Sequence, residues 1–586
     1  MSRSRRREAR SGSDATRRPL PAWAPDAAIA VALVVGYVAL LLATTHNLGY
    51  ARDEGFYFQA AASYEKWFDL LVHDRAAAMT RENVDRYWAV NHEHPALMKS
   101  LFALSHRILF ERWHWFREAG TSYRFPGMVV SALALGIVFV WGRIALGRWP
   151  GLVGALTLGL MPRVFYHSHL DCFDMPVASM WLVTTFAYWL SVERRSLAWA
   201  LITGVLYGLL LDTKHNAWLL PLALVAHAVV TGWPRLQRES RGGRVTVPAA
   251  LISMAVIGPL VLYAAWPWIW FDTAERLAWW VKFHLGHEYY NMEFLGETYW
   301  KPPMPRLYAP VMTLATVPLV TLVLFGVGAG CAAWEAVRTR WWPDLPSPAP
   351  PTPLEPPALR RTVLLWALCL LLSYAPWLSS NTPIFGGTKH WITAYPFLCL
   401  FAALGFAVAA DRLRVLAARW RHPFVSQGVP YALAAAVLIG PAKMTYDSHP
   451  WGLGFYAPLV GGAPGAATLG LNRSFWGYTT GAVVPYLNEH VPPGGTVYVH
   501  DTALQSWQML VRDGRLRSDI RATLRPQDAD VALYHHEPHM SRVEVQLWVL
   551  FGTVAPATIG TYEGVPIVWI YERPAVGRLG RRGATR

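Results

Sequence analysis

The sequence predicts an α-helical protein that crosses a membrane many times, and three features support this fold class. Of the 586 residues, 53% are hydrophobic and only 16% are charged, whereas soluble domains carry about 25% charged residues. Apolar segments of about 18–25 residues recur, which is the length needed to cross ~30 Å of hydrocarbon. Arginines gather in alternate connections between these segments. We predict about eleven spans, beginning near Ala27, Phe125, Gly151, Asp174, Trp199, Asn216, Val247, Ala309, Thr362, Trp391 and Val425.

The distribution of basic residues predicts how the chain is oriented. The apolar run after the basic amino-terminal segment is too long for a signal-peptide core, so we expect it to be a retained first span. With the amino terminus in the cytoplasm, the short outer connections carry only Lys214 and Lys389. This is the positive-inside pattern, and the net charge of +15 therefore reflects orientation and does not indicate nucleic-acid binding. The arginines of the inner connections are Arg143, Arg148, Arg194, Arg195, Arg235, Arg238, Arg241, Arg244, Arg338, Arg340, Arg360, Arg361, Arg412, Arg414, Arg419 and Arg421.

Three domains follow from this topology. They are a cytoplasmic amino terminus at residues 1–26, a transmembrane catalytic domain at 27–441, and an extracytoplasmic α/β domain at 442–586. The transmembrane domain contains two large outer loops and one inner linker. These are the first outer loop at 47–124, the outer loop at 271–308 and the Pro-rich cytoplasmic linker at 341–361.

Two of these regions have predictable internal structure. In the first outer loop, Leu97, Leu101, Leu104 and Ile108 recur at helical spacing, which predicts a helix lying in the membrane interface. In the carboxyl-terminal domain, "TVYVH", "DVALYHH" and "ATIGTYEGVPIVWIYE" predict strands, with a helix in "TALQSWQMLVRDG".

Ionisable side chains in four separate loops fall at one face of the membrane in this topology. Asp53 and Glu54 follow the first span directly in "NLGYARDEGFYFQAA", and Asp171 and Asp174 lie between the third and fourth spans. Charge at bilayer depth is costly and usually functional. Cations accompany these acids in the outer loops and near the outer ends of the spans, and we predict that they bind a donor phosphate. They are Arg52, His94, Lys99, Arg163, Lys214, His215, Lys389 and His390.

This set of residues matches the needs of sugar transfer from a lipid phosphate to a hydroxyl group. The leaving phosphate needs cations or oriented dipoles, and the acceptor hydroxyl needs a carboxylate base. We therefore predict catalytic roles for Asp53 and Glu54. No cofactor is required; His167, His169 and Asp171 alternate and could bring metal ligands together, which leaves a divalent metal open but not favoured.

Other readings of the same residues remain open. Asp53 and Glu54 could form a solvated turn at the end of a span, and Asp174, before Met175 and Pro176, suits a helix N-cap. A secondary transporter also uses intramembrane Asp, His and Lys, but transporters usually show repeated halves and broken helices at the midplane. A non-catalytic scaffold for envelope assembly is the third reading.

The segments "ARDEGFYFQAA", "HEHPALMK", "PRVFYHSHLDCFDMP", "DTKHNA" and "GGTKHW" resemble, in order and spacing, the dolichyl-phosphate-mannose–protein mannosyltransferases and the bacterial lipid A aminoarabinose transferases. The resemblance implies the GT-C fold, a polyprenyl-phosphate sugar donor, inversion at the sugar carbon and Asp53 as general base. It also implies a bacterial inner-membrane location with an extracytoplasmic site. His94 stands where lipid A transferases have a lysine, and the acceptor, whether protein, lipid or glycan, is not implied.

Overall fold

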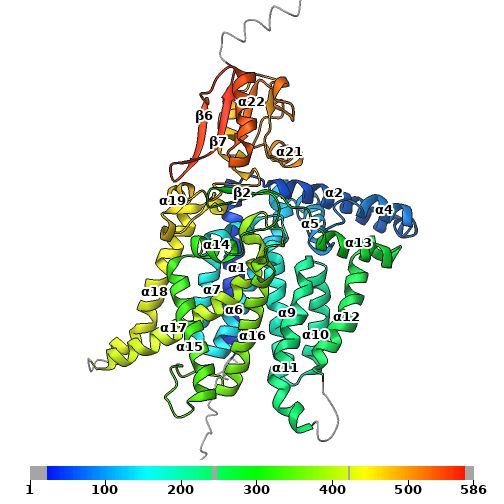
Figure 1. Cartoon of the computed structure of the whole chain (residues 1–586). Coiled ribbons are helices and arrows are strands. Elements are labelled where there is room, and N and C mark those ends of the chain that lie inside the picture. The colour runs from blue at the N-terminus through cyan, green and yellow to red at the C-terminus, as the bar shows by residue number, and fades with distance from the viewer. Residues whose placement is uncertain (1–22, 240–246, 420–422, 574–586) are drawn as a thin grey trace, which may run out of the picture.

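The computed structural model describes residues 23–239, 247–419 and 423–573. Their helices form a bundle that carries a small sheet domain at one end (Figure 1). Residues 1–22 of the predicted amino-terminal domain, and Arg241, Arg244 and Arg421, lie outside the described residues. Each predicted span coincides with one helix or with two consecutive helices: α1 (Ala24–Thr44), α6 (Ala119–Leu146), α7 (Arg148–Gly159), α8 (Pro162–His169), α9 (Asp174–Arg194), α10 (Leu197–Leu211), α11 (Leu220–Glu239), α12 (Ala249–Ala265), α14 (Tyr308–Thr316), α15 (Leu319–Trp341), α16 (Pro356–Tyr374), α17 (Tyr395–Ala418) and α18 (Pro423–Ser448).

Proline explains both spans that are split in two. Met161 and Val317 are extended, and each precedes a proline, Pro162 at the start of α8 and Pro318 before α15. A residue before proline avoids the helical region, and proline is well placed at the first turn of a new helix. The break before α8 leaves a short helix close to the sheet-domain end of the bundle.

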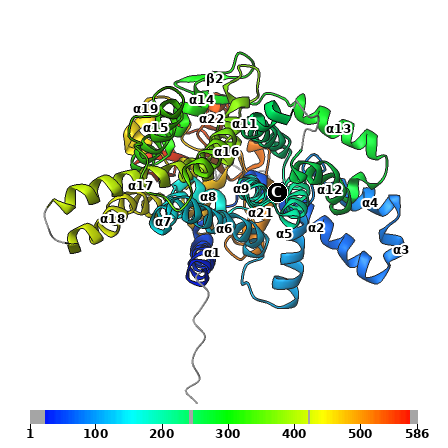
Figure 2. The ribbon, with the colours of Figure 1, turned by 90° about the horizontal axis from the view of Figure 1, so that it is seen from below.

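Six helical segments among the described residues are long and apolar enough to cross a membrane. The protein is therefore a multi-pass integral membrane protein. In the most apolar window of α9, and in that of α17, 89% of residues are buried, whereas the value for α1 is 11%. Figure 2 shows α1 at the edge of the bundle, so α9 and α17 form its centre. The six segments are Ala24–Asn47, Ala119–Leu146, Asp174–Arg194, Leu319–Trp341, Pro356–Leu378 and Ile392–Ala418.

Small residues allow central helices to approach closely. A Cβ atom on Gly328 of α15 would lie 1.9 Å from the Phe401 carbonyl oxygen, and one on Gly405 of α17 would lie 1.9 Å from that of Leu324. Neither position accepts a larger residue without moving a backbone. Such small-residue contacts are typical of helix packing in membranes.

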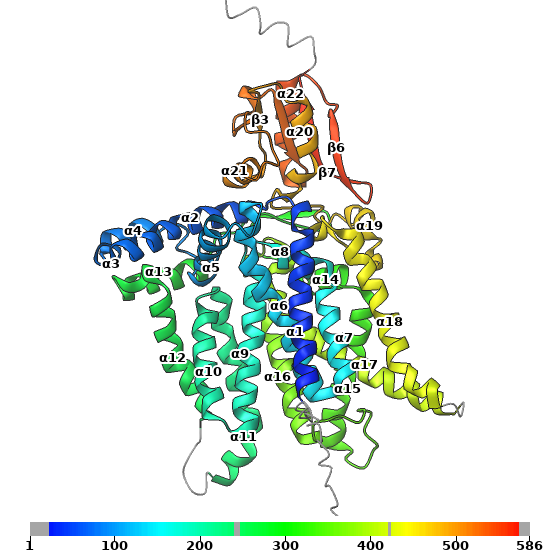
Figure 3. The same ribbon diagram turned by 180° about the vertical axis from the view of Figure 1, so that it is seen from behind.

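The first outer loop lies across the end of the bundle (Figure 3). The predicted helix forms, but Leu97, Leu101, Leu104 and Ile108 are only partly buried, whereas Phe102 and its neighbours pack inward. The elements of the two outer loops are α2 (Arg52–His73), α3 (Arg75–Ala78), α4 (Arg81–Trp88), α5 (Leu97–Ser105), a π-helical turn (His106–Arg112), α13 (Thr273–Leu285), β1 (Met292–Phe294) and β2 (Glu297–Tyr299).

The carboxyl-terminal domain is a mixed five-stranded sheet in the order β4-β3-β5-β7-β6. The strands β3, β5, β6 and β7 and the helix α21 form where the sequence patterns predict them, whereas β4 was not predicted. β3 runs parallel to β4 and β5, while β7 runs antiparallel to β5 and β6. α18 continues to Ser448, beyond residue 441 where we expected the transmembrane domain to end. The elements are α19 (Gly462–Thr468), α20 (Val484–His490), β3 (Thr496–Tyr498), α21 (Leu504–Arg512), β4 (Arg521–Thr523), β5 (Val531–His535), α22 (Ser541–Phe551), β6 (Thr558–Tyr562) and β7 (Val565–Glu572).

Candidate functional site

A cavity of about 370 Å³ lies where the bundle meets the sheet domain. Segments far apart in sequence line it: the start of α2, the loop before α5, α8, the second outer loop, the "FGGTK" loop and two loops of the carboxyl-terminal domain. Its charged and imidazole lining residues are Arg52, Asp53, Glu93, His94, Arg163, His287, Glu293, Lys389, Asp501 and Glu537.

Asp53 lies in the first turn of α2 with its carboxylate on the cavity wall. Its Oδ2 is 3.3 Å from Lys389 Nζ, and its Oδ1 is 3.9 Å from Arg52 Nε. The Asp53 side chain is 20% exposed, so it reaches the cavity while remaining mostly enclosed. A carboxylate near a helix N-terminus is also stabilised by the helix dipole.

Two cations share this wall of the cavity. Lys389 Nζ lies 4.2 Å from the centre of the Trp476 ring. Arg163 is 2% exposed; its Nε and Nη2 donate to the Phe455 carbonyl oxygen at 3.3 Å, while its Nη1 is buried without a hydrogen-bond partner among the described residues. Because a buried donor is costly to leave unpaired, Arg163 is suited to bind an anion.

The glycine pair in "FGGTKHW" explains how the loop brings Lys389 to this wall. Gly386 and Gly387 have φ values of +77° and +61°, which residues with a Cβ rarely adopt. A Cβ on Gly387 would lie 3.4 Å from Arg163 Nη1. The glycines therefore allow the turn and leave room beside the arginine.

Glu54, the neighbour of Asp53, points away from the cavity. It is fully buried and forms two bonds with Arg124, from Nε to Oε1 at 2.7 Å and from Nη2 to Oε2 at 2.8 Å. Its oxygens also accept from the backbone nitrogens of Ala51 at 2.8 Å and Asp171 at 3.0 Å. Glu54 thus joins α2, α6 and the loop before α9, and the structure does not bring it to the cavity with Asp53.

The two acids between α8 and α9, Asp171 and Asp174, also lie behind the cavity wall. Asp171 is fully buried, its carboxylate oxygens have no hydrogen-bond partner among the described residues, and burial raises its pKa well above the ordinary value, with the charge of Glu54 adding to the effect. Asp174 Oδ1 accepts from Lys214 Nζ at 2.6 Å, and its Oδ2 is 3.5 Å from His167 Nδ1. Phe173, not Asp174, is the N-cap of α9, and no side chain caps the helix there. The capping interpretation is therefore wrong, and the Asp174 side chain makes an ion pair instead.

The remaining predicted phosphate ligands divide into two groups. His94 lines the cavity, as do Arg52, Arg163 and Lys389, but the other four do not. Lys99 Nζ donates to the carbonyl oxygens of Asn91 at 2.5 Å and His94 at 2.8 Å, and Lys214 pairs with Asp174. His215 stacks on His284 with ring centres 3.9 Å apart, and His390 packs on Trp377 at 4.5 Å.

His94 connects the cavity with the buried groups behind it. Burial holds its pKa well below the ordinary value, and nearby Lys99, His284, Lys214 and Lys389 act in the same direction. His94 is therefore a neutral ring, and it packs against Phe173 at 5.2 Å. As a neutral group it contributes hydrogen bonding to the cavity and no fixed charge.

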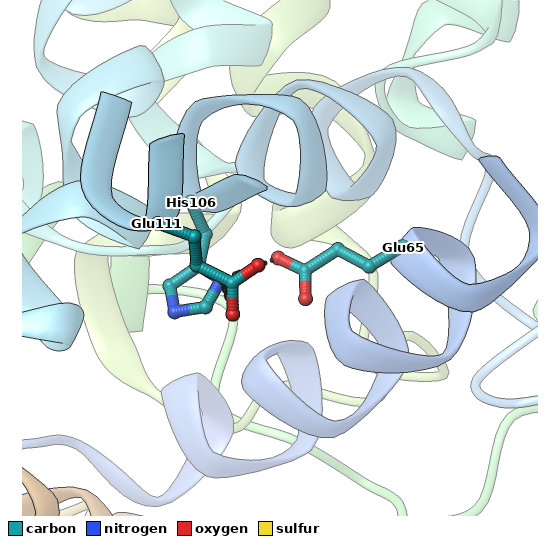
Figure 4. Close-up of side chains that lie close together, drawn as sticks. All are labelled: Glu65, His106 and Glu111. Atoms are coloured by element: carbon teal, nitrogen blue, oxygen red, sulfur yellow. Dashed lines mark hydrogen bonds and ion pairs between the residues drawn. The ribbon is translucent and has the colours of Figure 1, made fainter. Parts of the chain in front are cut away.

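The three residues considered as metal ligands do not come together. Positions two apart on a helix point about 200° apart, and in α8 His169 Nε2 contacts Thr44 Oγ1 at 2.8 Å while His167 faces Asp174. Among the described residues, the group close enough to hold a metal is Glu65, His106 and Glu111, outside the cavity (Figure 4). Arg512 donates to His106 Nε2 at 2.8 Å. His106 Nδ1 therefore carries a proton, and it donates to Glu65 Oε1 at 2.6 Å. Both ring nitrogens of His106 are thus already hydrogen-bonded.

The sequence interpretation missed Asp501, Glu537 and Glu293 on the cavity, and Arg124 beside it. Asp501 and Glu537 follow the strands β3 and β5. Both strands were predicted, and side chains just beyond the carboxyl ends of parallel strands are common ligand contacts. That rule could have identified Asp501 and Glu537, whereas no local pattern indicated Glu293 or Arg124.

Comparison with known proteins identifies part of the chain. Residues 94–263 match the family model described as dolichyl-phosphate-mannose-protein mannosyltransferase. This segment is similar to that family. It covers less than a third of the chain and includes Arg163, Asp171, Asp174 and Lys214. The predicted architecture, a helical membrane protein with a small carboxyl-terminal α/β domain, is confirmed.

Solved structures similar to this chain include ArnT from Cupriavidus metallidurans bound to undecaprenyl phosphate, at 14% identity over 92% of this chain and 97% of that chain, with a TM-score of 0.46. ArnT in the apo state is 15% identical over 93% and 98%, with a TM-score of 0.43. The oligosaccharyltransferase of Archaeoglobus fulgidus in the apo form is 11% identical over 90% and 71%, with a TM-score of 0.45. Among curated protein sequences, none matches this chain.

Proposed function

We propose that this protein transfers a sugar, with inversion, from a polyprenyl-phosphate donor to a hydroxyl group of an extracytoplasmic protein, lipid or glycan, with Asp53 as general base. The observation that carries the proposal is the wall of the cavity, where the Asp53 carboxylate lies 3.3 Å from Lys389 Nζ and the unpaired Nη1 of Arg163 is buried close by. The same cavity thus offers a base for one reactant and cations for the other.

The cations would bind the donor phosphate and stabilise it as it leaves. Arg163 contributes a free N–H, and Lys389 contributes an ammonium group held over the Trp476 ring. Groups fixed in place before reaction stabilise developing charge without reorganisation. Because the leaving group is already a phosphate and the cavity supplies cations, the proposed reaction needs neither a general acid nor a metal.

Asp53 would remove the proton of the acceptor hydroxyl as the oxygen attacks the sugar carbon. The proton moves to Asp53, the new bond forms at the face opposite the phosphate, and the bond from carbon to phosphate oxygen breaks. Such proton transfer contributes about 10²–10⁴-fold to a rate. Glu54 would act indirectly, by holding the first turn of α2 in position through Arg124.

We further propose a bacterial inner-membrane location with the cavity on the extracytoplasmic side. Arg143 and Arg148 pair with Asp26 at 2.7 Å each, at the start of α1, and the sheet domain lies at the opposite end of the bundle (Figure 1). This arrangement supports the positive-inside orientation. The acceptor would then approach from outside the cytoplasm.

Purified full-length protein in liposomes tests the proposal. Undecaprenyl phosphate carrying radiolabelled mannose, glucose or arabinose is supplied with an envelope extract from cells lacking the protein. We expect transfer of one of these sugars, inhibited by bare undecaprenyl phosphate. In Arg163→Gln the inhibitor should bind about 10–100-fold more weakly because a charge-assisted bond is lost, while Arg361→Gln, whose partner Glu193 belongs to α9 away from the cavity, should match the wild type. Equal inhibition of all three proteins would contradict the assigned phosphate site.

A further inference from the structure

The carboxyl-terminal domain contributes its own acidic wall to the cavity. Asp501 lies in the loop after β3, and Glu537 lies in the loop after β5; both line the cavity. Asp501 pairs with Arg52, and Glu537 lies beside His539. The bundle alone would leave this side of the cavity open. The sheet domain is therefore part of the site.

The position of these two loops in the sheet is one at which ligands commonly bind. β3 and β5 are parallel neighbours, and the chain leaves β3 through α21 toward β4 on one side, but leaves β5 through α22 toward β6 and β7 on the other. Leu547 of α22 packs with Ala532 and Tyr534 on one face of the sheet, while α21 joins the core that includes Val531 and Leu533 of the other face. Such a reversal of direction creates a crevice at the carboxyl ends of the strands.

Asp501 presents an unsatisfied acceptor to this crevice. Its side chain is 3% exposed, and Oδ1 accepts from Arg52 Nη1 at 2.6 Å. Oδ2 is buried without a hydrogen-bond partner among the described residues. A buried polar atom without a partner is uncommon in folded proteins and points to a ligand or to a functional role.

The loop that carries Asp501 is held in an unusual conformation. Asp501 has a φ of +51°, and a Cβ on Gly477 would lie 2.0 Å from the Asp501 carbonyl oxygen. Left-handed backbone at a residue with a side chain stores strain and is common at ligand sites. The close approach of Gly477 therefore fixes the backbone of the loop that carries Asp501.

Glu537 extends the acidic wall. Its Oε2 lies 3.5 Å from His539 Nδ1, which is 3.1 Å from Glu293 Oε1. Burial, together with the charge of Asp501, raises the pKa of Glu537 well above its ordinary value, which favours a protonated carboxyl that can donate as well as accept. The wall thus combines hydrogen-bond donors and acceptors.

The chemistry of this wall selects its ligand. The two carboxyl groups offer several oxygen acceptors and no cation for the donor phosphate, so the wall suits a neutral group that offers many hydrogen-bond donors. Aromatic rings of Trp476, Phe475 and Tyr290 line the same cavity, and ligand sites combine such apolar surfaces with a few placed polar groups. We propose that Asp501 and Glu537 form a carbohydrate subsite that binds the hydroxyl groups of the transferred sugar or of a sugar-bearing acceptor. This inference rests on the proposed sugar transfer and assigns part of the sugar recognition to the carboxyl-terminal domain.

Binding and transfer measurements with the full-length protein in liposomes test this subsite. The probes are bare undecaprenyl phosphate and undecaprenyl phosphate carrying mannose, glucose or arabinose. The variants are Asp501→Asn, which keeps a carbonyl oxygen for Arg52, and Glu537→Gln. Asp528→Asn, on an exposed pair with Arg525 in the same domain, is the matched control, and thermal unfolding confirms that each variant is folded.

If the subsite holds the donor sugar, the variants should bind the best sugar-bearing lipid about 10-fold more weakly, because an amide replaces the carboxyl group and hydrogen bonds to the sugar hydroxyl groups are lost, and bind the bare lipid as the wild type does. If it holds the acceptor, binding of every lipid is unchanged and the half-saturating concentration of the envelope extract rises by a similar factor. Variants that match Asp528→Asn in both measurements overturn the proposal. Failure of the proposed function would be a separate result: Arg163→Gln would then bind bare undecaprenyl phosphate as tightly as the wild type does.

Discussion

Asp53 and Glu54 are adjacent in the chain, yet they belong to two different regions of the molecule. Asp53 faces the cavity beside Lys389, 20% exposed, whereas Glu54 is fully buried in a bidentate pair with Arg124. Consecutive residues on a helix point about 100° apart, so the start of α2 directs one carboxylate to the cavity and the other into the packing between α2 and α6. The comparison shows that an acid pair near a membrane surface can divide into one reactive group and one structural group.

The largest expected effect is on stability, and it separates the buried region around Glu54 from the cavity region that contains Asp53. Glu54→Gln leaves the Arg124 guanidinium buried without its anion, and breaking a buried pair in this way costs about 3–5 kcal/mol. We expect a strong fall in the unfolding temperature, measured by intrinsic fluorescence in detergent, and a smaller loss of transfer per folded molecule than in Asp53→Asn, because Glu54 only positions the turn that carries Asp53. Glu82→Gln, an exposed glutamate of α4, should have a negligible effect; a Glu54 variant as stable as that control would refute the structural role.

The next effect concerns the cations at the cavity. Lys389→Met removes an ammonium group from the wall that holds Asp53, and we expect about 10–100-fold weaker binding of undecaprenyl phosphate, as for the loss of one charge-assisted contact. Lys389→Arg should restore part of this affinity because it keeps the charge. Titration of the lipid into liposomes provides the measurement, and unchanged affinity in Lys389→Met would remove Lys389 from the phosphate site.

Lys214 provides a cation of the same kind outside the cavity lining. Its Nζ is paired with Asp174 at 2.6 Å, so Lys214→Met should lower the unfolding temperature while changing lipid affinity by less than about 3-fold. The same two measurements apply. A loss of affinity as large as that of Lys389→Met would show that the two lysines act in one phosphate site, as the sequence interpretation proposed.

A further effect is a pH dependence of stability at Lys99. Burial lowers the pKa of Lys99 to about 7, while an unfolded lysine has a pKa of about 10.4. Between these values the unfolded chain binds more protons than the folded one, so the contribution of Lys99 to stability rises with pH. The unfolding temperature of the wild type relative to Lys99→Met should therefore be lowest below pH 7 and increase toward pH 10; a difference that is constant with pH would contradict the shift.

Much of this arrangement could be predicted because it depends on local patterns. Each predicted span coincides with one helix or with two consecutive helices, and six helical segments among the described residues are long and apolar enough to cross a membrane. The loops that the charge bias predicts to be outer lie at one end of the bundle, where Asp53 and Lys389 line one cavity. The inward face of α5 and the division between Asp53 and Glu54 depend on how α2 and α6 pack, and no local pattern records that contact. Lys214 and Lys389 occur in similar "TKH" contexts, and only the tertiary fold pairs one with Asp174 and the other with Asp53.

The role of Asp53 as the base is tested most directly by the single-turnover transfer rate of Asp53→Asn with saturating donor, compared with the wild type at equal folded concentration. We predict a loss of about 10²–10⁴-fold, with binding of undecaprenyl phosphate retained because Arg163 and Lys389 are still present. A transfer rate within a few-fold of the wild type would show that another group removes the proton and that this cavity has been assigned the wrong base.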